Sequence, residues 1–191
     1  MPLAEELRDA GAGLVQLRDK VSPRERVLDA ALSLRRVFAG SGTLFILNDH
    51  ADIALRAGCD GVHLGQNDTG IADARRLLGA GALIGISCFS AADAVAAQGS
   101  GADYLGIGPV FPTGTKECSR FCGTAAAAAV KPLISVPFFF IGGITTDNLP
   151  GLLSAGAERV AVCSAVIRAA DPAEEVRRFT AILKKGLEDD L

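Results

Sequence analysis

Short apolar runs of strand length alternate along the chain with longer stretches in which apolar residues recur at helical spacing. Such runs are typical of strands in a buried parallel sheet, and the stretches between them have the pattern of amphipathic helices. The chain therefore predicts repeated β-α units. Seven strands are expected, at Gly13 to Leu17, Leu44 to Leu47, Gly61 to Leu64, Leu83 to Ser87, Tyr104 to Val110, Phe138 to Ile141 and Arg159 to Cys163.

The segments between these runs predict helices, and several of them end at a glycine. Helices are expected over Pro23 to Phe38, Ile71 to Leu78 and Asp171 to Lys185. A glycine where a helix gives way to the next strand suits a left-handed C-cap. Three such junctions resemble one another, namely Ala57-Gly58-Cys59-Asp60, Ser100-Gly101-Ala102-Asp103 and Ala155-Gly156-Ala157-Glu158. Their similarity indicates that the β-α unit is itself the repeat.

Polar residues follow nearly every expected strand, and their distribution separates two ways of arranging a β-α chain. An open doubly wound sheet concentrates such groups at one switch point, whereas the βα loops of a TIM barrel all open on one face. Here they run from the segment Gln16-Leu17-Arg18-Asp19-Lys20, at the end of the first strand, to Ser164 after the last. The sequence therefore favours a TIM (β/α)8 barrel, as a single domain over residues 1–191.

The expected strands number one fewer than such a barrel needs. The chain opens with an expected helix, Ala4 to Ala10, of the kind that precedes the second strand. Without its first strand the sheet would have two open edges, which is an aggregation hazard. We expect the first strand to be missing from this chain. Either it lies upstream of this reading frame, which we favour, or a partner covers the gap that it leaves.

Composition indicates which kinds of partner the protein can bind and in which cellular compartment it is expected. The 191 residues carry a net charge of −3, which disfavours a nucleic-acid partner. The sequence has no signal-peptide pattern and no apolar window of about 20 residues, so a cytoplasmic protein with no membrane partner is expected. Five cysteines suit a reducing compartment; Cys118 and Cys122 could form a metal or redox pair, but two small loop residues are the favoured interpretation.

The end of the first expected strand and the residues after it carry a cluster of cationic and amide groups. Gln16, Arg18 and Lys20 alternate along the chain, so their side chains would lean to the same side. Arg grips phosphate as a fork and Lys acts as a point charge, which suits a polyphosphate ligand. A solvated barrel rim is the alternative.

Two carboxylates follow neighbouring strands. Asp49 and Asp68 come after the runs at Leu44 and Gly61, so a barrel brings both to the same mouth. Oxygen ligands beside a cationic pocket are what Mg²⁺ needs when it bridges protein and pyrophosphate. As an alternative, each aspartate could cap the helix that follows it, at Ala51 to Arg56 or near Ile71.

A second group of candidate residues follows the later strands. Thr113, Thr115 and Lys116 share one loop with a glycine, which suits an anion. Gly143, together with Cys163 and Ser164, falls where TIM barrels bind phosphate, in the loops after strands 7 and 8. Two anion sites, and hence two phosphorylated substrates, are expected.

No pattern in the chain indicates a protein nucleophile. There is no Walker loop, no Ser/His/Asp set and no complete dinucleotide fingerprint. His63 lies within an apolar run, where a barrel-lining histidine with satisfied hydrogen bonds is favoured over a catalytic base. Covalent catalysis is therefore disfavoured.

Six motifs, in this order, make the chain similar to the thiamine-phosphate synthases, from about Ala4 to the last helix. Each is modest alone, but six in register are specific. They are Gln16-Leu17-Arg18-Asp19-Lys20, Asn48-Asp49, Gly61-Val62-His63-Leu64-Gly65-Gln66-Asn67-Asp68, Ile84-Gly85-Ile86-Ser87, Gly106-Ile107-Gly108-Pro109-Val110-Phe111-Pro112-Thr113-Gly114-Thr115-Lys116 and Ile141-Gly142-Gly143-Ile144.

The resemblance implies a transferase of thiamine biosynthesis that joins hydroxymethylpyrimidine pyrophosphate to a thiazole phosphate and releases pyrophosphate. It also implies a dissociative mechanism, small-molecule substrates and an Mg²⁺ cofactor. Whether the protein forms a homodimer is left open. By position, the pyrophosphate would be held by Gln16, Arg18, Lys20 and Lys116, of which Arg18, Lys20 and Lys116 would be the catalytic cations. The pyrimidine substrate would contact Asn48 and Ser87, and Mg²⁺ would be bound by Asp49 and Asp68. The thiazole phosphate would be bound by Thr113, Thr115, Gly143, Cys163 and Ser164.

Two other functions compete with this one. The related thiazole tautomerases would carry a histidine where this chain has Pro109, and their aspartate pair is eroded, so both features point away from them. A non-catalytic barrel that binds a phosphometabolite is the second alternative, which the missing strand would support. The retained charged groups argue against it.

Overall fold

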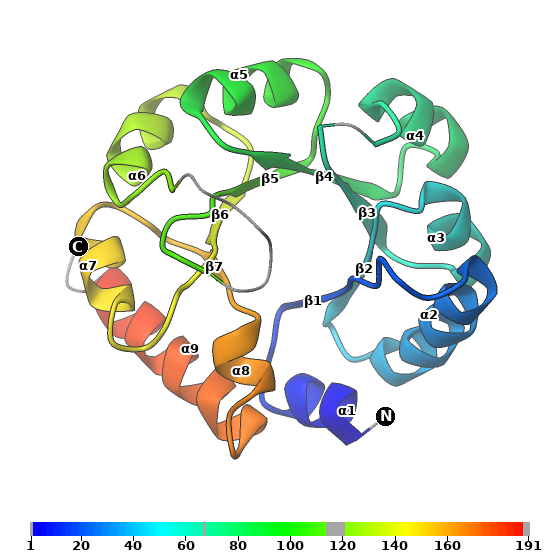
Figure 1. The fold of residues 1–191 in the computed structure, drawn as a ribbon, viewed down its shortest axis with the longest axis horizontal. Coiled ribbons are helices and arrows are strands. Elements are labelled where there is room, and N and C mark those ends of the chain that lie inside the picture. Colours follow the sequence, from blue (N-terminus) through cyan, green and yellow to red (C-terminus); the bar gives the residue numbers. More distant parts are fainter. Residues whose placement is uncertain (1, 67, 114–120, 189–191) are drawn as a thin grey trace.

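The computed structural model describes residues 2–66, 68–113 and 121–188. In it, seven parallel strands form a curled sheet with the helices outside it (Figure 1). Each strand pairs in parallel with the next one along the chain, which confirms the parallel β/α barrel class. The strands are β1 (Leu14–Leu17), β2 (Leu44–Asn48), β3 (Gly61–Leu64), β4 (Leu83–Cys88), β5 (Tyr104–Ile107), β6 (Phe138–Ile141) and β7 (Val160–Ala161).

Helices alternate with these strands and cover the outer face of the sheet. None of the described helices is both long and apolar enough to cross a membrane. They are α1 (Pro2–Asp9), α2 (Arg24–Phe38), α3 (Ala51–Ala57), α4 (Ile71–Leu78), α5 (Ala91–Gly99), α6 (Ala125–Val130), the 3-10 helix η1 (Lys131–Leu133), α7 (Leu149–Ser154), α8 (Ser164–Ile167) and α9 (Pro172–Glu188).

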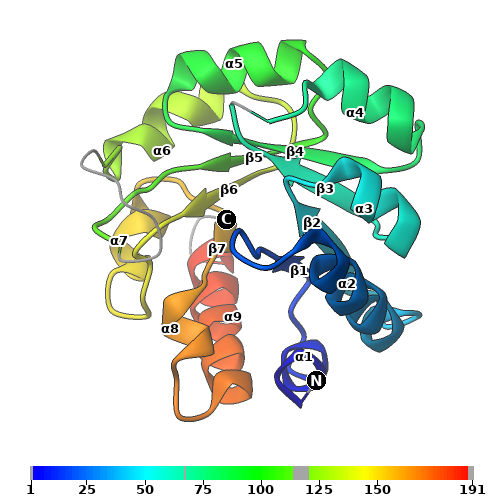
Figure 2. The same cartoon turned by 45° about the vertical axis from the view of Figure 1, so that its right-hand side comes forward.

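The sheet has two edges, β1 and β7, and in the described ranges no strand lies between them. Figure 2 shows the side on which the sheet stays open. The helix layer nevertheless closes there, because α1 packs against α9. The structure thus agrees with a barrel that has seven of its eight strands in these residues.

Alternation along each strand divides the side chains between two environments. On β2, Phe45 stacks on Phe38 of α2 at 5.6 Å between ring centroids, so Phe45 and Leu47 face the helices. Ile46 and Asn48 therefore face the barrel interior, because successive side chains point to opposite faces of a sheet. The inward-facing positions carry the chemistry, and the outward-facing ones form the main core.

The three repeated helix-to-strand junctions have a common construction. Gly58, Gly101 and Gly156 all have positive φ, as the predicted left-handed C-caps require. In the first two junctions the acidic residue anchors a neighbouring strand: Asp60 accepts the N–H of Phe45, and Asp103 accepts the N–H of Ile84. These bonds begin β2 and β4 at fixed positions.

Two strands are shorter than the apolar pattern predicts. The fifth strand ends at Ile107 rather than Val110, since Pro109 has no N–H to continue the ladder. Beyond it, the N–H of Val110 donates to the carbonyl of Ile141, so the chain turns across the end of β6. The seventh strand comprises only Val160–Ala161, as β7 pairs on one side alone.

Candidate active site

The cationic and acidic residues predicted from the first three strands meet at one mouth of the barrel. Lys20 follows β1, and its Nζ lies 2.7 Å from Oδ2 of Asp49, which follows β2. Gln16 and Arg18 are both exposed, and Arg18 forms no ion pair with any other described residue. Within the part of the chain that the structure describes, the Arg18 guanidinium thus carries a charge that no carboxylate neutralises.

Backbone geometry fixes the position of Asp49. Its φ is +66°, the only positive value recorded for a described residue other than glycine. Its N–H donates to the carbonyl of His63, which ties this turn to β3. A left-handed conformation at a non-glycine residue is costly and recurs at functional sites, where the surrounding structure enforces it.

The electrostatics of Asp49 reflect the groups around it. Burial acts to raise its pKa, but hydrogen bonding with Lys20 and Asp68, together with the electrostatic effects of Lys20 and His50, outweighs burial. The pKa of Asp49 therefore lies below its usual range. Adjacent carboxylates repel unless a proton or a cation lies between them, so this pair is a suitable place for a cation.

Asp68 and Asp49 do not cap the helices that follow them. The N-cap of α3 is His50 and that of α4 is Gly70, and neither helix has a side-chain cap. Oδ2 of Asp68 instead accepts the N–H of Gly65 at 2.6 Å, which turns the chain after β3 back toward the mouth. The capping alternative is therefore wrong for both aspartates.

Further along the sheet, Asn48 and Ser87 lie on the inner face. Asn48 ends β2 opposite His63, and Ser87 lies on β4, with Oγ 3.0 Å from Nε2 of His63. The side-chain amide of Gln66 donates to the carbonyl of Ser87. His63 thus has the satisfied hydrogen bonds expected of a barrel-lining histidine.

The second predicted group lies on the later strands. Gly143 has φ +65°, and a Cβ there would lie 2.4 Å from the carbonyl oxygen of Pro112, so glycine is required for the close approach of the two loops. Cys163 is the N-cap of α8, and Ser164 is its first residue. Thr113 lies beyond β5 and is half-buried, while Thr115, Lys116 and Cys118 fall outside the described residues.

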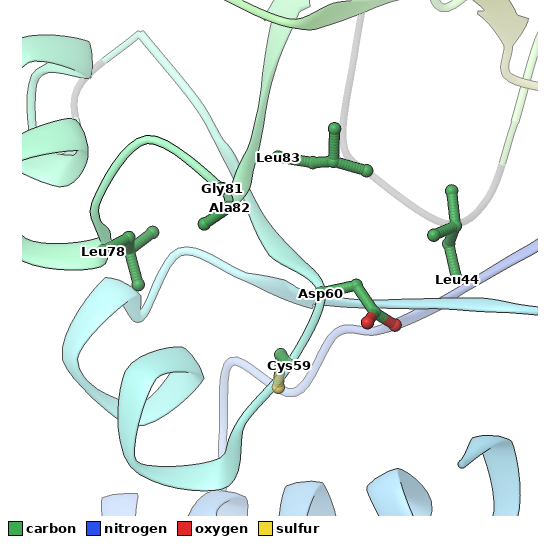
Figure 3. Close-up of a pocket in the computed structure, with 7 residues that line it drawn as sticks. All are labelled: Leu44, Cys59, Asp60, Leu78, Gly81, Ala82 and Leu83. Carbon is green, nitrogen blue, oxygen red and sulfur yellow. The ribbon is translucent and has the colours of Figure 1, made fainter. Parts of the chain in front are cut away.

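A hollow of about 400 Å³ lies at the opposite end of the barrel, beside the first residues of β2 and β4 (Figure 3). Burial raises the pKa of the Cys59 thiol there to about 11, so the thiol is protonated at neutral pH. In TIM barrels this end contributes stability rather than catalysis. The hollow is therefore separate from the candidate active site.

Sequence reasoning missed two residues that contact the predicted ones. Gln66 belongs to the motif Gly61 to Asp68 but was given no role, although it follows a strand, as Arg18 and Lys20 do. Tyr104 hydrogen-bonds to His63, 41 positions away in the chain, and no sequence spacing signals that contact.

A curled parallel sheet with helices outside, and with charged groups at the carboxyl ends of its strands, defines an enzyme of the TIM-barrel class. The chain belongs to the thiamine monophosphate synthase family, whose model matches residues 1–166. This confirms the resemblance drawn from the six motifs, together with the expected function in thiamine biosynthesis and the expected transferase class.

Individual relatives support this assignment. A thiamine-phosphate synthase of Gloeobacter violaceus is 45% identical over 184 residues, which are 96% of this chain but 54% of that protein. One of Methanoculleus marisnigri is 45% identical over 88% of this chain and 81% of its own length. The thiamine phosphate pyrophosphorylase of Pyrococcus furiosus superposes with a TM-score of 0.89 at 32% identity, covering 97% of this chain and 90% of that one.

Proposed function

We propose that this mouth of the barrel joins a pyrimidine pyrophosphate to a thiazole phosphate, giving thiamine phosphate and pyrophosphate. The observation that carries the proposal is the meeting of Lys20, Asp49 and Asp68, from three successive strands, near Arg18, which forms no ion pair with another described residue. A cationic group and a carboxylate pair in one place suit a pyrophosphate together with the metal ion that accompanies it.

The chemistry asks little of the protein beyond charge and position. The bond between the pyrimidine methylene carbon and the pyrophosphate oxygen breaks first, and the electron pair leaves with the pyrophosphate. The thiazole nitrogen then donates its lone pair to the resulting carbocation, and the new C–N bond forms. No side chain has to act as a nucleophile, so catalysis consists of neutralising the leaving group and holding two substrates in line.

Each cationic or amide group has a part in this scheme. Arg18 and Lys20, with Gln16 and Lys116, bind the pyrophosphate and stabilise its growing charge. Asn48 and Ser87 orient the pyrimidine from the inner face of β2 and β4. A second set of residues holds the thiazole phosphate; these are Thr113, Thr115, Gly143, Cys163 and Ser164.

The carboxylate pair fits an Mg²⁺ ion. Asp68 is among the groups that lower the pKa of Asp49, and an ammonium group already lies against Asp49, so this place favours positive charge. Mg²⁺ is usually held by one or two carboxylates, several waters and substrate phosphate, so two aspartates suffice as its protein ligands. When bound by Asp49 and Asp68, Mg²⁺ would neutralise charge on the departing pyrophosphate.

One assay tests the reaction itself. The purified chain is incubated with both phosphorylated substrates and Mg²⁺, and pyrophosphate release is measured with and without the thiazole phosphate. We expect thiamine phosphate and pyrophosphate in equal amounts. If the folded protein binds both substrates and forms neither product, the barrel is a phosphometabolite-binding protein.

A variant pair tests the metal assignment. Asp49→Asn should lower kcat by at least about tenfold while substrate binding changes less. Asp73→Asn, which removes an exposed carboxylate on α4, is the control and should keep the wild-type rate. If Asp49→Asn retains the Mg²⁺-dependent rate, Asp49 is not a ligand.

A further inference from the structure

Three side chains on the inner face of the barrel form a connected hydrogen-bonded set. Nδ1 of His63 lies 3.1 Å from the hydroxyl of Tyr104, and Nε2 lies 3.0 Å from Oγ of Ser87. His63 is 8% exposed and Tyr104 is 7% exposed. The set therefore connects two buried rings to a residue at the candidate active site.

Strand register builds this set around a glycine. Gly85 on β4 pairs with His63 of β3 on one side and with Tyr104 of β5 on the other. A Cβ on Gly85 would lie 2.1 Å from Cζ of Tyr104. Glycine at this position thus leaves the space in which the two rings meet.

A second glycine and an aromatic contact complete the enclosure. A Cβ on Gly106 would lie 3.1 Å from Cε1 of His63, closer than most such contacts. The ring of Phe139 packs edge-on against Tyr104, at 5.9 Å between centroids. The His63 ring is therefore held by packing as well as by hydrogen bonds.

The hydroxyl of Tyr104 decides which nitrogen of His63 carries the proton. Burial raises the pKa of Tyr104, so its phenol keeps its proton at neutral pH. Within the described ranges, that hydroxyl has no hydrogen-bond partner besides Nδ1 of His63. Because a buried donor left unpaired is costly, Tyr104 donates to Nδ1, and the proton of His63 is on Nε2.

The consequence falls on Ser87. Nε2 of His63 then donates to Oγ of Ser87 and occupies one of its lone pairs. The serine O–H remains to be donated elsewhere. We propose that His63 is a positioning residue, which Tyr104 holds so that the Ser87 hydroxyl faces the active site as a hydrogen-bond donor to an acceptor atom of the pyrimidine pyrophosphate. The identity of this ligand rests on the proposed function.

The tautomer can be measured without substrate. The chain has only two histidines, so long-range ¹H–¹⁵N correlation spectra of labelled protein resolve both, and the signals missing in His63→Gln identify His63. We expect the Nε2–H tautomer in the wild type. In Tyr104→Phe, the signal of the unprotonated Nδ1 should move toward that of a free acceptor nitrogen. A proton on Nδ1 in the wild type would overturn the proposal.

Kinetics test the effect on Ser87. Tyr104→Phe should raise KM for the pyrimidine pyrophosphate by roughly two- to tenfold, the effect of one hydrogen bond, and should leave KM for the thiazole phosphate unchanged. His63→Gln, which keeps an amide donor near the position of Nε2, should stay closer to wild type than His63→Leu. Phe139→Leu is the matched control, because it loosens the Tyr104 ring and removes no hydrogen bond.

The outcomes separate this proposal from the synthase reaction. If Tyr104→Phe and Phe139→Leu lower the melting temperature alike and neither changes KM, the set is structural and His63 has no positioning role. A wild-type protein that shows the Nε2–H tautomer and forms no thiamine phosphate refutes the synthase function, while the orientation of Ser87 stands.

Discussion

Gly85→Ala tests the argument that a glycine on β4 makes room for two aromatic rings. The new methyl group would lie 2.1 Å from Cζ of Tyr104 and 2.5 Å from both Cε atoms, so the ring would have to move by about 1.3 Å or more to regain normal contact. His63 and Phe139 pack against that ring, so it has little room to move.

The expected loss follows from three contributions. Overpacking a core costs about 1–3 kcal/mol. The broken hydrogen bond between Tyr104 and His63 adds about 1 kcal/mol. Replacing glycine by alanine restrains the unfolded chain and returns about 0.4–1 kcal/mol. We therefore expect a net loss of about 1–3.6 kcal/mol, or roughly 2–14 °C in Tm for a chain of this size.

Urea denaturation followed by circular dichroism measures this loss. Gly81→Ala is the control, because a Cβ there meets nothing within 4 Å, and it should stay within about 0.5 kcal/mol of the wild type. In a Tyr104→Leu background, Gly85→Ala should cost at least about 1 kcal/mol less than in the wild type. An equal cost in both backgrounds would refute the reasoning.

Three further outcomes are expected. Gly143→Ala should displace the loop after β5 and lower the affinity for the thiazole phosphate, because Gly143 has a positive φ and a Cβ there would lie 2.4 Å from the carbonyl oxygen of Pro112. Calorimetric titration with the substrate measures this affinity, and an unchanged value would contradict the prediction. Ser90→Ala should cost about 1 kcal/mol in urea denaturation, since Ser90 caps α5. Burial acts to raise the pKa of Asp93, but hydrogen bonds from Ser90 and from the Phe89 N–H outweigh it, so this pKa is lowered. Its stabilisation is therefore present at neutral pH and is lost as pH falls below about 4, and Asp93→Asn should flatten that acid limb of the stability curve.

Most of the fold could be predicted from the sequence because its signals are local. Apolar runs located all seven strands, and Gly58, Gly101 and Gly156 marked the helix ends that have positive φ. The residues at which strands end were harder to predict, because pairing with the neighbouring strand decides them. The fifth strand stops at Ile107, where Pro109 turns the chain across β6.

The sequence also determined which side chains gather at the active mouth, since parallel strands carry the residues that follow them to the same end of a barrel. That argument placed Lys20, Asp49 and Asp68 together, but it left helix capping open as the role of both aspartates. Only the tertiary structure excluded capping, by showing Asp49 against Lys20 and Asp68 against the N–H of Gly65.

Only the tertiary structure brought Tyr104 to His63 and turned His63 toward Ser87. These residues belong to β5, β3 and β4, and their contact depends on strand register across Gly85, which no local pattern encodes. Sequence thus determined the order of the strands and the chemistry at their ends. The register between strands decided which of those groups touch, because hydrogen bonds across a barrel join residues that are far apart in the chain.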